Sequence, residues 1–255
     1  MAVPNAQPGI SLHKQALRLG ALALALVGLP GCQSIAGTGT AGASGNNVAE
    51  LRVINASPDP TLPGLDFYLN NTALAYNVGY GTISSYIPVA PGSYTISADG
   101  DGTRQALVSG AATLVNAHTY TTLIGNELAN LSQTVLQDQS TPAPSGEVSF
   151  RFIDQASKVG AVDIYLIPTG STLITTLPFL TDVTFGTNTG YLSIPANTYT
   201  ISMVPTGTAP IATTVTLFTG TQKAYASGAV RTVIMVDQQV TTVPGLQVIY
   251  ASDVD

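Results

Sequence analysis

An internal repeat constrains this chain more than any other feature of its sequence. Arg52-Val-Ile-Asn55 matches Arg151-Phe-Ile-Asp154, and Leu65-Asp-Phe-Tyr-Leu69 matches Val162-Asp-Ile-Tyr-Leu166. Tyr94-Thr-Ile96 and Tyr199-Thr-Ile201 continue the match. The offset between the copies changes along the chain, which is expected if loops of different length join matched strands. The sequence therefore predicts a duplicated domain, and each copy is long enough to bury a core of its own.

Both copies consist of short apolar runs separated by turn residues, and no segment has a sustained helical period. Thr is abundant, whereas Glu and Lys, which normally cover helix surfaces, are scarce. About seven strands are typical of an antiparallel β-sandwich. The fold class is therefore all-β. In the first copy we expect strands at Glu50–Asn55, Leu65–Leu69, Ser84–Val89, Ser93–Ala98, Gln105–Ser109, Thr119–Gly125 and Leu131–Gln137.

Two polar stretches divide the chain. Residues 32–47 are rich in Gly, Ala, Ser and Thr and predict a flexible tether. Residues 138–146 hold two prolines and predict a linker between a first sandwich at 48–137 and a second at 147–255. Because this linker is almost free of apolar side chains, we expect few contacts across it and two sandwiches that fold separately.

The first 31 residues have the pattern of a secretory signal peptide. Lys14 and Arg18 precede an apolar run at 19–29, which is too short to span a bilayer. The run ends in Leu29-Pro30-Gly31-Cys32, which resembles the bacterial lipoprotein signal. That resemblance implies cleavage before Cys32 and lipidation of its sulfur, so the lipid would be the contact with the membrane. The alternative is an ordinary signal peptide with a bystander cysteine. Gln33, in place of Asp, favours the outer membrane in a Gram-negative cell.

A family resemblance follows from the repeat. Arg52-Val-Ile-Asn-Ala-Ser-Pro-Asp59, followed by Leu65-Asp-Phe-Tyr-Leu69, resembles the opening of the bacterial surface family named domain of unknown function 4397. The resemblance is looser in the second copy, where Gln155-Ala-Ser-Lys158 replaces the Ala-Ser-Pro-Asp turn. It implies tandem immunoglobulin-like sandwiches on an exported, often lipid-anchored protein. It implies no activity.

Composition excludes several classes of function. The net charge of −6 argues against nucleic-acid binding, and a count of one Cys and two His argues against a Cys/His zinc site. His118 is the only histidine after the signal peptide, and no nucleophile motif accompanies it. Asp66 and Asp163 fall in separate copies, so nothing pairs them for glycoside hydrolysis. We therefore expect no enzyme activity and no cofactor.

Four residues are candidates for binding loops. Asp99 and Asp101, in Asp-Gly-Asp-Gly, could offer oxygens to calcium, but a hairpin turn explains the same residues. Tyr76 and Tyr80 lie near Gly79 and Gly81 and could present rings to a ligand, although tyrosine in a sandwich is more often half-buried.

Two further pairs are expected to be structural. Arg52 with Asp66, and Arg151 with Asp163, lie in the first two strands of their copies. A carboxylate inside an apolar run needs donors, and guanidinium can supply two. The rival partners for each Asp are turn amides.

The sequence thus favours a non-catalytic envelope lipoprotein whose tandem sandwiches act as an interaction or spacer module, with an envelope protein or glycan as the unidentified partner. The alternative is a lipoprotein that binds a small ligand or a carbohydrate.

Overall fold

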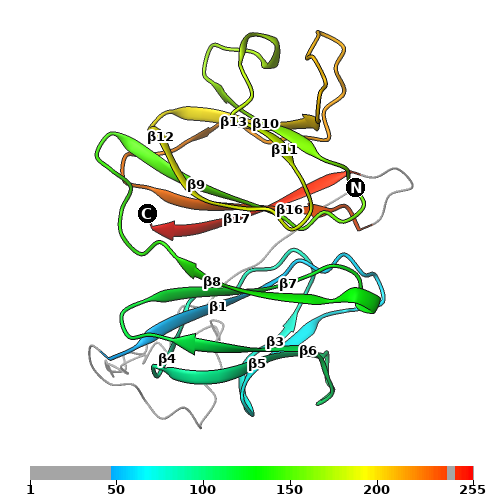
Figure 1. The fold of residues 1–255 in the computed structure, drawn as a ribbon, viewed down its shortest axis with the longest axis vertical. Helices are drawn as coiled ribbons and strands as arrows, with labels where there is room; N and C mark the ends of the chain where they lie inside the picture. The colour runs from blue at the N-terminus through cyan, green and yellow to red at the C-terminus, as the bar shows by residue number, and fades with distance from the viewer. Residues whose placement is uncertain (1–46, 240–244, 255) are drawn as a thin grey trace, which may run out of the picture. The chain divides into compact units, whose positions relative to one another are not determined.

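The structure is a computed structural model that describes residues 47–239 and 245–254. The signal peptide, Cys32 and nearly all of the tether lie outside the described residues. The predicted all-β, sandwich class is confirmed, since strands account for nearly all regular structure and only two short 3-10 turns occur in the described part, η1 (Leu128–Asn130) and η2 (Leu173–Thr175) (Figure 1). Within these ranges no helix has the length and apolar character needed to span a membrane.

The strands before residue 139 form two four-stranded sheets, with the orders β4-β1-β7-β8 and β3-β2-β5-β6. Neighbouring strands are antiparallel except β1 and β7, which run parallel. Their bounds are β1 (Ala49–Asn55), β2 (Leu65–Leu69), β3 (Thr72–Val78), β4 (Ile87–Val89), β5 (Gly92–Gly100), β6 (Ala106–Leu114), β7 (Thr119–Gly125) and β8 (Ser132–Asp138).

The strands after residue 146 repeat this plan. One sheet has the order β12-β9-β16-β17, again with a parallel pair, β9 and β16, and the other is built around β10 and β13. Their bounds are β9 (Glu147–Asp154), β10 (Val162–Pro168), β11 (Leu180–Val183), β12 (Asn188–Pro195), β13 (Thr198–Pro205), β14 (Phe218–Thr219), β15 (Lys223–Ala224), β16 (Val230–Asp237) and β17 (Leu246–Val254).

Strand alternation explains which side chains lie on each face of these sheets. Leu51 and Val53 in β1 point into the core of the first sandwich, and Phe150 and Phe152 in β9 point into the core of the second. The residues between and beyond them therefore turn to the outer faces of the same sheets. In most sandwiches such faces are polar, but here they carry Ile54 and Ile153, which are buried.

One apolar cluster explains that burial, because it draws on both sandwiches. Its members are Ile54, Ala56, Leu123, Ile153, Ile234, Val236 and Ile249, with Tyr80, Ile83 and Leu136 packed against them. The sheet of β1 and β7 thus lies against the sheet of β9 and β16. The expectation of few contacts between the sandwiches is wrong, because the linker's composition says nothing about the sheet faces that it connects.

Candidate functional site

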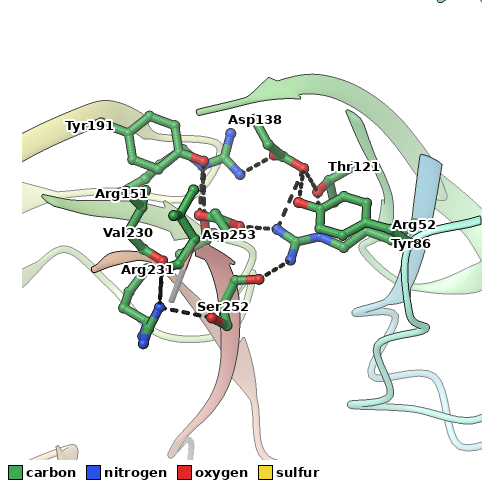
Figure 2. A network of polar contacts seen from close by, with 12 residues as sticks. Arg52, Tyr86, Thr121, Asp138, Arg151, Tyr191, Val230, Arg231, Ser252 and Asp253 are labelled. Carbon is green, nitrogen blue, oxygen red and sulfur yellow. Dashed lines mark hydrogen bonds and ion pairs between the residues drawn. The ribbon is translucent and has the colours of Figure 1, made fainter. Parts of the chain in front are cut away.

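A buried polar network lies beside this apolar cluster, and Figure 2 shows it from close by. Arg52, on the outer face of β1, is only 2% exposed. Its Nε donates to Thr121 Oγ1 in β7 at 2.8 Å. Its Nη1 donates to the carbonyl of Ser252 in β17 at 3.0 Å, and its Nη2 pairs with the carboxylate of Asp253. The guanidinium of the first sandwich is therefore neutralised by the last strand of the second.

Arg151 of the second sandwich makes the same set of contacts in the opposite direction. Arg151 in β9 is 2% exposed, and its Nε donates to Thr232 Oγ1 in β16 at 3.0 Å. Its Nη1 donates to the carbonyl of Gln137 at 3.3 Å, and its Nη2 reaches Asp138 Oδ1, at the end of β8, at 2.5 Å. Each arginine thus binds its own sandwich through Nε and the other sandwich through its two terminal nitrogens.

A tyrosine completes each half of the network. Tyr86 donates its hydroxyl to Asp138 Oδ2 at 2.7 Å, and Tyr191 donates to Asp253 Oδ2 at 2.9 Å. The Cζ atoms of Arg52 and Arg151 lie 4.6 Å from the ring centroids of Tyr86 and Tyr191 respectively. Burial, followed by the charge of the neighbouring aspartate, raises the pKa of the Tyr86 hydroxyl, and burial raises that of Tyr191. Both hydroxyls therefore act as neutral donors at physiological pH.

The two halves are related by the internal repeat. The equivalent pairs are Arg52 and Arg151, Thr121 and Thr232, Tyr86 and Tyr191, and Asp138 and Asp253. Thr121 and Thr232 add a hydrogen bond to the aspartate of their own sandwich, at 2.5 and 2.6 Å. The network is thus approximately symmetric, with two cations facing two anions.

The charges of the network are buried but compensated. The carboxylates of Asp138 and Asp253 are fully buried, and Asp138 also lies 3.5 Å from Arg52 Nη2. Burial alone lowers the pKa of Arg52, but the charges of Asp138 and Asp253 outweigh it and raise that pKa above its ordinary value. An arginine left here without its partner would be a buried, uncompensated charge. The network therefore couples the stability of one sandwich to the presence of the other.

Side-chain size breaks the symmetry of the contact. A Cβ atom on Gly125 would lie 2.0 Å from Oε1 of Gln155, a residue of the second sandwich that is 6% exposed. At the equivalent positions the chain has Val236 and Ala56, both in the apolar cluster. The second sandwich supplies the larger residue of each set, Gln155 and Val236, and the first sandwich supplies the smaller, Gly125 and Ala56. This arrangement favours pairing of the first sandwich with the second over pairing of two identical copies.

The expected pairing of Arg52 with Asp66 is wrong. β1 and β2 belong to different sheets of the sandwich, and both side chains point outward, on opposite sides. Asp66 instead accepts hydrogen bonds from the backbone N–H of Asn77 at 2.8 Å and of Gly102 at 3.1 Å. The rival interpretation, turn amides as donors, is therefore the one that the structure bears out.

The same correction holds for Arg151 and Asp163. Asp163 accepts from the N–H groups of Asp182 at 3.0 Å and Gly207 at 3.1 Å, and from the Thr206 hydroxyl at 2.9 Å. Asn77 and Asp182 both have positive φ, as do Gly102 and Gly207. In each copy one carboxylate therefore fixes a left-handed residue of an irregular edge strand and a left-handed glycine of a turn.

Sequence reasoning missed Asp138 and Asp253 as partners of the arginines. Asp138 falls in the predicted linker at 138–146, and no prediction gives Asp253 a role. A signal was present, because Gln137-Asp138 and Ser252-Asp253 occupy corresponding places at the ends of the two copies. It was weak, because a short polar ending is normal for any strand.

The four candidate loop residues are not all brought together. Tyr80 is half-buried between the sandwiches, where its hydroxyl donates to the carbonyl of Asp237, so it is not part of an exposed loop. Tyr76 is 59% exposed on β3. Asp99 is buried and accepts from Ser97 Oγ at 3.0 Å, whereas Asp101 is exposed in the following turn.

Two of these candidates, Tyr76 and Asp101, lie in segments that meet on the outer face of the first sandwich. Asp66 holds the segments of Tyr76 and Asp101 together through its two amide contacts. Arg104 lies with its Cζ 4.1 Å from the ring centroid of Tyr68, and the Tyr76 ring meets Tyr68 edge-on at 6.1 Å. We call Tyr68, Tyr76, Asp101 and Arg104 the aromatic patch. Tyr68 itself is only 3% exposed, so the groups open to a polar ligand are the Tyr76 ring, the Arg104 guanidinium and the Asp101 carboxylate.

A second pair of buried carboxylates lies in the second sandwich. Asp154 ends β9 and Asp237 ends β16, and both are nearly fully buried. Asp237 accepts from the N–H groups of Ser157 and Lys158, whereas Asp154 accepts from Ala156 N–H. Burial and the charge of Asp237 raise the pKa of Asp154 to about 6, against the opposing effect of the Ala156 hydrogen bond.

The structure also places His118, the histidine considered as a catalytic base. His118 lies in the turn before β7, where its Nδ1 contacts the Asn116 carbonyl at 2.8 Å rather than a carboxylate. Within residues 47–239 and 245–254, no cluster of three or more His, Cys, Asp or Glu side chains has the geometry of a metal site.

Part of this chain matches a known protein family. A family model described as Domain of unknown function (DUF4397) matches residues 49–165. The match covers the first sandwich and extends into the first strands of the second. It supports the resemblance to that family for this part of the chain, and it assigns no activity.

The other comparisons add no functional argument. A search of curated proteins gives no match. Among solved structures, a streptococcal virulence factor that binds alpha-glucan shares 9% identity at a TM-score of 0.24, covering 73% of this chain and 92% of that one. A second match is to family 41 carbohydrate-binding modules from streptococcal virulence factors, which recognise alpha-glucan. It has 10% sequence identity and a TM-score of 0.23, and it covers 73% of this chain and 92% of that one. Scores this low carry no inference about ligand.

The exchanged ion pair predicts strong coupling between Arg52 and Asp253. Replacing either by Ala leaves the other charge buried, so each single variant should lose about 3 kcal/mol of unfolding free energy. The double variant should lose at least about 1 kcal/mol less than the sum of the two. Denaturant unfolding of the four proteins measures this difference. Arg52→Ala combined with Asp66→Ala is the matched control and should be additive within about 0.5 kcal/mol. Additivity for Arg52 and Asp253 would contradict the coupling.

The raised pKa of Asp154 predicts that the free energy of unfolding depends on pH between about 4 and 6. Because its folded-state pKa is about 6 and its ordinary value is 3.8, its contribution to stability is fully present below about pH 4 and is lost as the pH rises to about 6. Asp154→Asn, which restores the amide found at the equivalent Asn55, should therefore stabilise the protein at pH 7 by up to about 3 kcal/mol and bring no gain at pH 4.

Thermal or denaturant unfolding of this variant across pH 4–8 tests the sign. Asp182→Asn is the matched control, because Asp182 is exposed in the same sandwich and Asn77 occupies the equivalent left-handed position in the first. An Asp154→Asn effect that did not change with pH would contradict a raised pKa.

Proposed function

We propose that this protein is a non-catalytic lipoprotein of the cell envelope, whose two sandwiches work as one interaction or spacer module. The observation that carries the proposal is the network in which Arg52 and Arg151 exchange carboxylates between the sandwiches. Its polar groups are satisfied by one another, so its chemistry serves cohesion and not turnover. A body joined in this way transmits position and force from one end to the other.

The location is proposed from the N-terminal sequence. Cys32 follows an apolar run of signal-peptide length, and residues 33–47 form a polar tether long enough to hold a folded body about 20 Å from a surface. Removal of residues 1–31 takes away Lys14 and Arg18 and leaves a more acidic protein, which anionic headgroups repel. The acyl chains at Cys32 therefore supply the anchor, in the outer membrane if the cell is Gram-negative. The partner is an envelope protein or glycan, and nucleic acid is excluded by charge.

A second candidate function is recognition of a carbohydrate or other small polar ligand. The aromatic patch favours it, since the exposed Arg104 lies over the Tyr68 ring, Tyr76 meets that ring edge-on, and Asp101 is exposed in the turn that precedes Arg104. Such a combination of ring faces, guanidinium and carboxylate can bind sugar hydroxyls and rings. The second sandwich has no equivalent of Arg104 at this place, so the site would be confined to the first.

The anchor is tested by replacement of Cys32. Cys32→Ser should abolish labelling by an alkyne palmitate in cells and release the protein from the membrane fraction, because it removes the only thiol. Ser34→Ala, two residues away, should leave both unchanged. Unaltered labelling of Cys32→Ser would overturn the lipoprotein assignment.

The carbohydrate candidate is tested on residues 33–255 with glycan arrays. Binding of at least one glycan class is expected, with a loss of tenfold or more in Tyr76→Ala and Arg104→Ala. Tyr250→Ala, which changes an exposed tyrosine of the second sandwich, should leave binding unchanged. No glycan signal for the unaltered protein would remove this candidate and leave the spacer module untouched.

A further inference from the structure

Two loops of the second sandwich expose an unusual set of apolar side chains. Residues 169–179 join β10 to β11, and residues 206–217 join β13 to β14. Ile174 and Leu177 in the first loop are 54% and 86% exposed, and Ile211 and Val215 in the second are 62% and 86% exposed. In the first sandwich the corresponding connections are short, and one is only Asn70-Asn71. The loops are therefore insertions found in one copy alone.

The loops project away from the rest of their sandwich. Figure 1 shows both rising beyond the sheet of β10 and β13, on the side opposite β9, β16 and β17. They leave that sheet at opposite ends, because β10 and β13 are antiparallel and the loops follow Pro168 and Pro205. Two tips on either side of one sheet face can both meet a surface that lies across that face.

The first loop is held in shape by its own contacts. Leu173 packs against Tyr165, Ile167 and Val204 on the outer face of the sheet. Thr172 and Thr175 form a reciprocal capping arrangement around η2. Leu173 thus joins an apolar surface of the sheet, whereas Leu177, four residues further on, stays 86% exposed.

The second loop is fixed at its base and at its tip. Thr206 and Gly207 donate to the buried carboxylate of Asp163. At the tip, the Ile211 N–H donates to Thr214 Oγ1 at 2.7 Å and the Thr214 N–H donates back to the Ile211 carbonyl at 3.0 Å. These polar groups are already hydrogen-bonded, so transfer of the tip out of water carries a reduced desolvation cost.

The absence of charged side chains from the two loops favours a lipid surface over a protein as their partner. Neither 169–179 nor 206–217 contains Asp, Glu, Lys, Arg or His, in a chain whose net charge is −6. They thus form a region that anionic headgroups do not repel. The exposed groups are aliphatic, whereas the energetic centres of protein interfaces are enriched in Trp, Tyr and Arg. Large exposed apolar groups on a soluble domain mark a membrane or protein contact, and this composition favours the membrane.

We propose that these two loops form a second membrane contact, in which Ile174, Leu177, Ile211 and Val215 insert into the interfacial region of a lipid bilayer. The inference rests on the proposed function only in that the Cys32 anchor keeps the sandwiches near a bilayer and raises the effective concentration of the loops there. The loops would then orient the second sandwich on the membrane, leaving the aromatic patch of the first sandwich for other partners.

The test uses residues 33–255, which lack the lipid site, in flotation with phosphatidylcholine vesicles. The unaltered protein should partition onto the vesicles, and Leu177→Ser with Val215→Ser should lower the partition coefficient at least fivefold. Val115→Ser is the matched control, since Val115 is 48% exposed on the first sandwich, and it should leave partition unchanged. Added phosphatidylglycerol at low salt should weaken binding of this acidic protein.

Three outcomes would overturn the proposal. They are no partition of the unaltered protein at millimolar lipid, equal partition of the double variant, and a dimer in gel filtration that the double variant converts to a monomer, which would make a second copy the occupant. Because Cys32 is absent from the tested protein, failure here is separate from failure of the palmitate labelling, which tests the anchor alone.

Discussion

The exchange of carboxylates between two buried arginines is the interaction on which the rest of this architecture depends. Arg52 and Arg151 sit at the centres of their sheets, where a guanidinium without a partner would be strongly destabilising. Neither sandwich satisfies its own arginine, since the principal acceptor of each comes from the other. A buried ion pair is a weak source of net stability, but it strongly penalises arrangements that break it. Here it specifies which faces meet and in which register.

Around this network, the two sandwiches are alike in some places and differ in others. The arginine, threonine, tyrosine and aspartate of the network recur in both copies, as does the aspartate that fixes two turns. The contact residues Gly125 and Gln155 differ from their equivalents Val236 and Ala56. The outer faces differ most, with rings and charges on one sandwich and uncharged aliphatic loops on the other. The proposed carbohydrate and membrane contacts both lie on the outer faces, where the two sandwiches differ.

The sequence predicted the all-β class and most strands of the first sandwich, because these follow from local alternation and turn residues. Strand β3 was missed, since Thr72–Val78 has a polar residue within it and no clear alternation. The face-to-face contact of the sandwiches was also missed. Alternation shows that Ile54 and Arg52 leave the core of their own sheet, but no local pattern tells whether water or another sheet covers them. The predicted partner of Arg52 was Asp66, in the next strand, whereas its carboxylate acceptor is Asp253, which is 201 residues away in the sequence.

The position of Asp253 has a consequence for the order of folding. It lies in β17, the last strand, yet it neutralises an arginine of β1, the first. During folding, the first sandwich can form its sheets early, but Arg52 then has only Asp138, at a longer distance, for compensation. The outer face of β1 and β7 stays incomplete until the C-terminal strand docks. Contacts this distant in sequence form slowly, because a long loop must close before they are made. The fold is therefore complete only when its first and last described strands meet, so a chain cut short before Asp253 would leave the outer face of β1 without its main counter-charge.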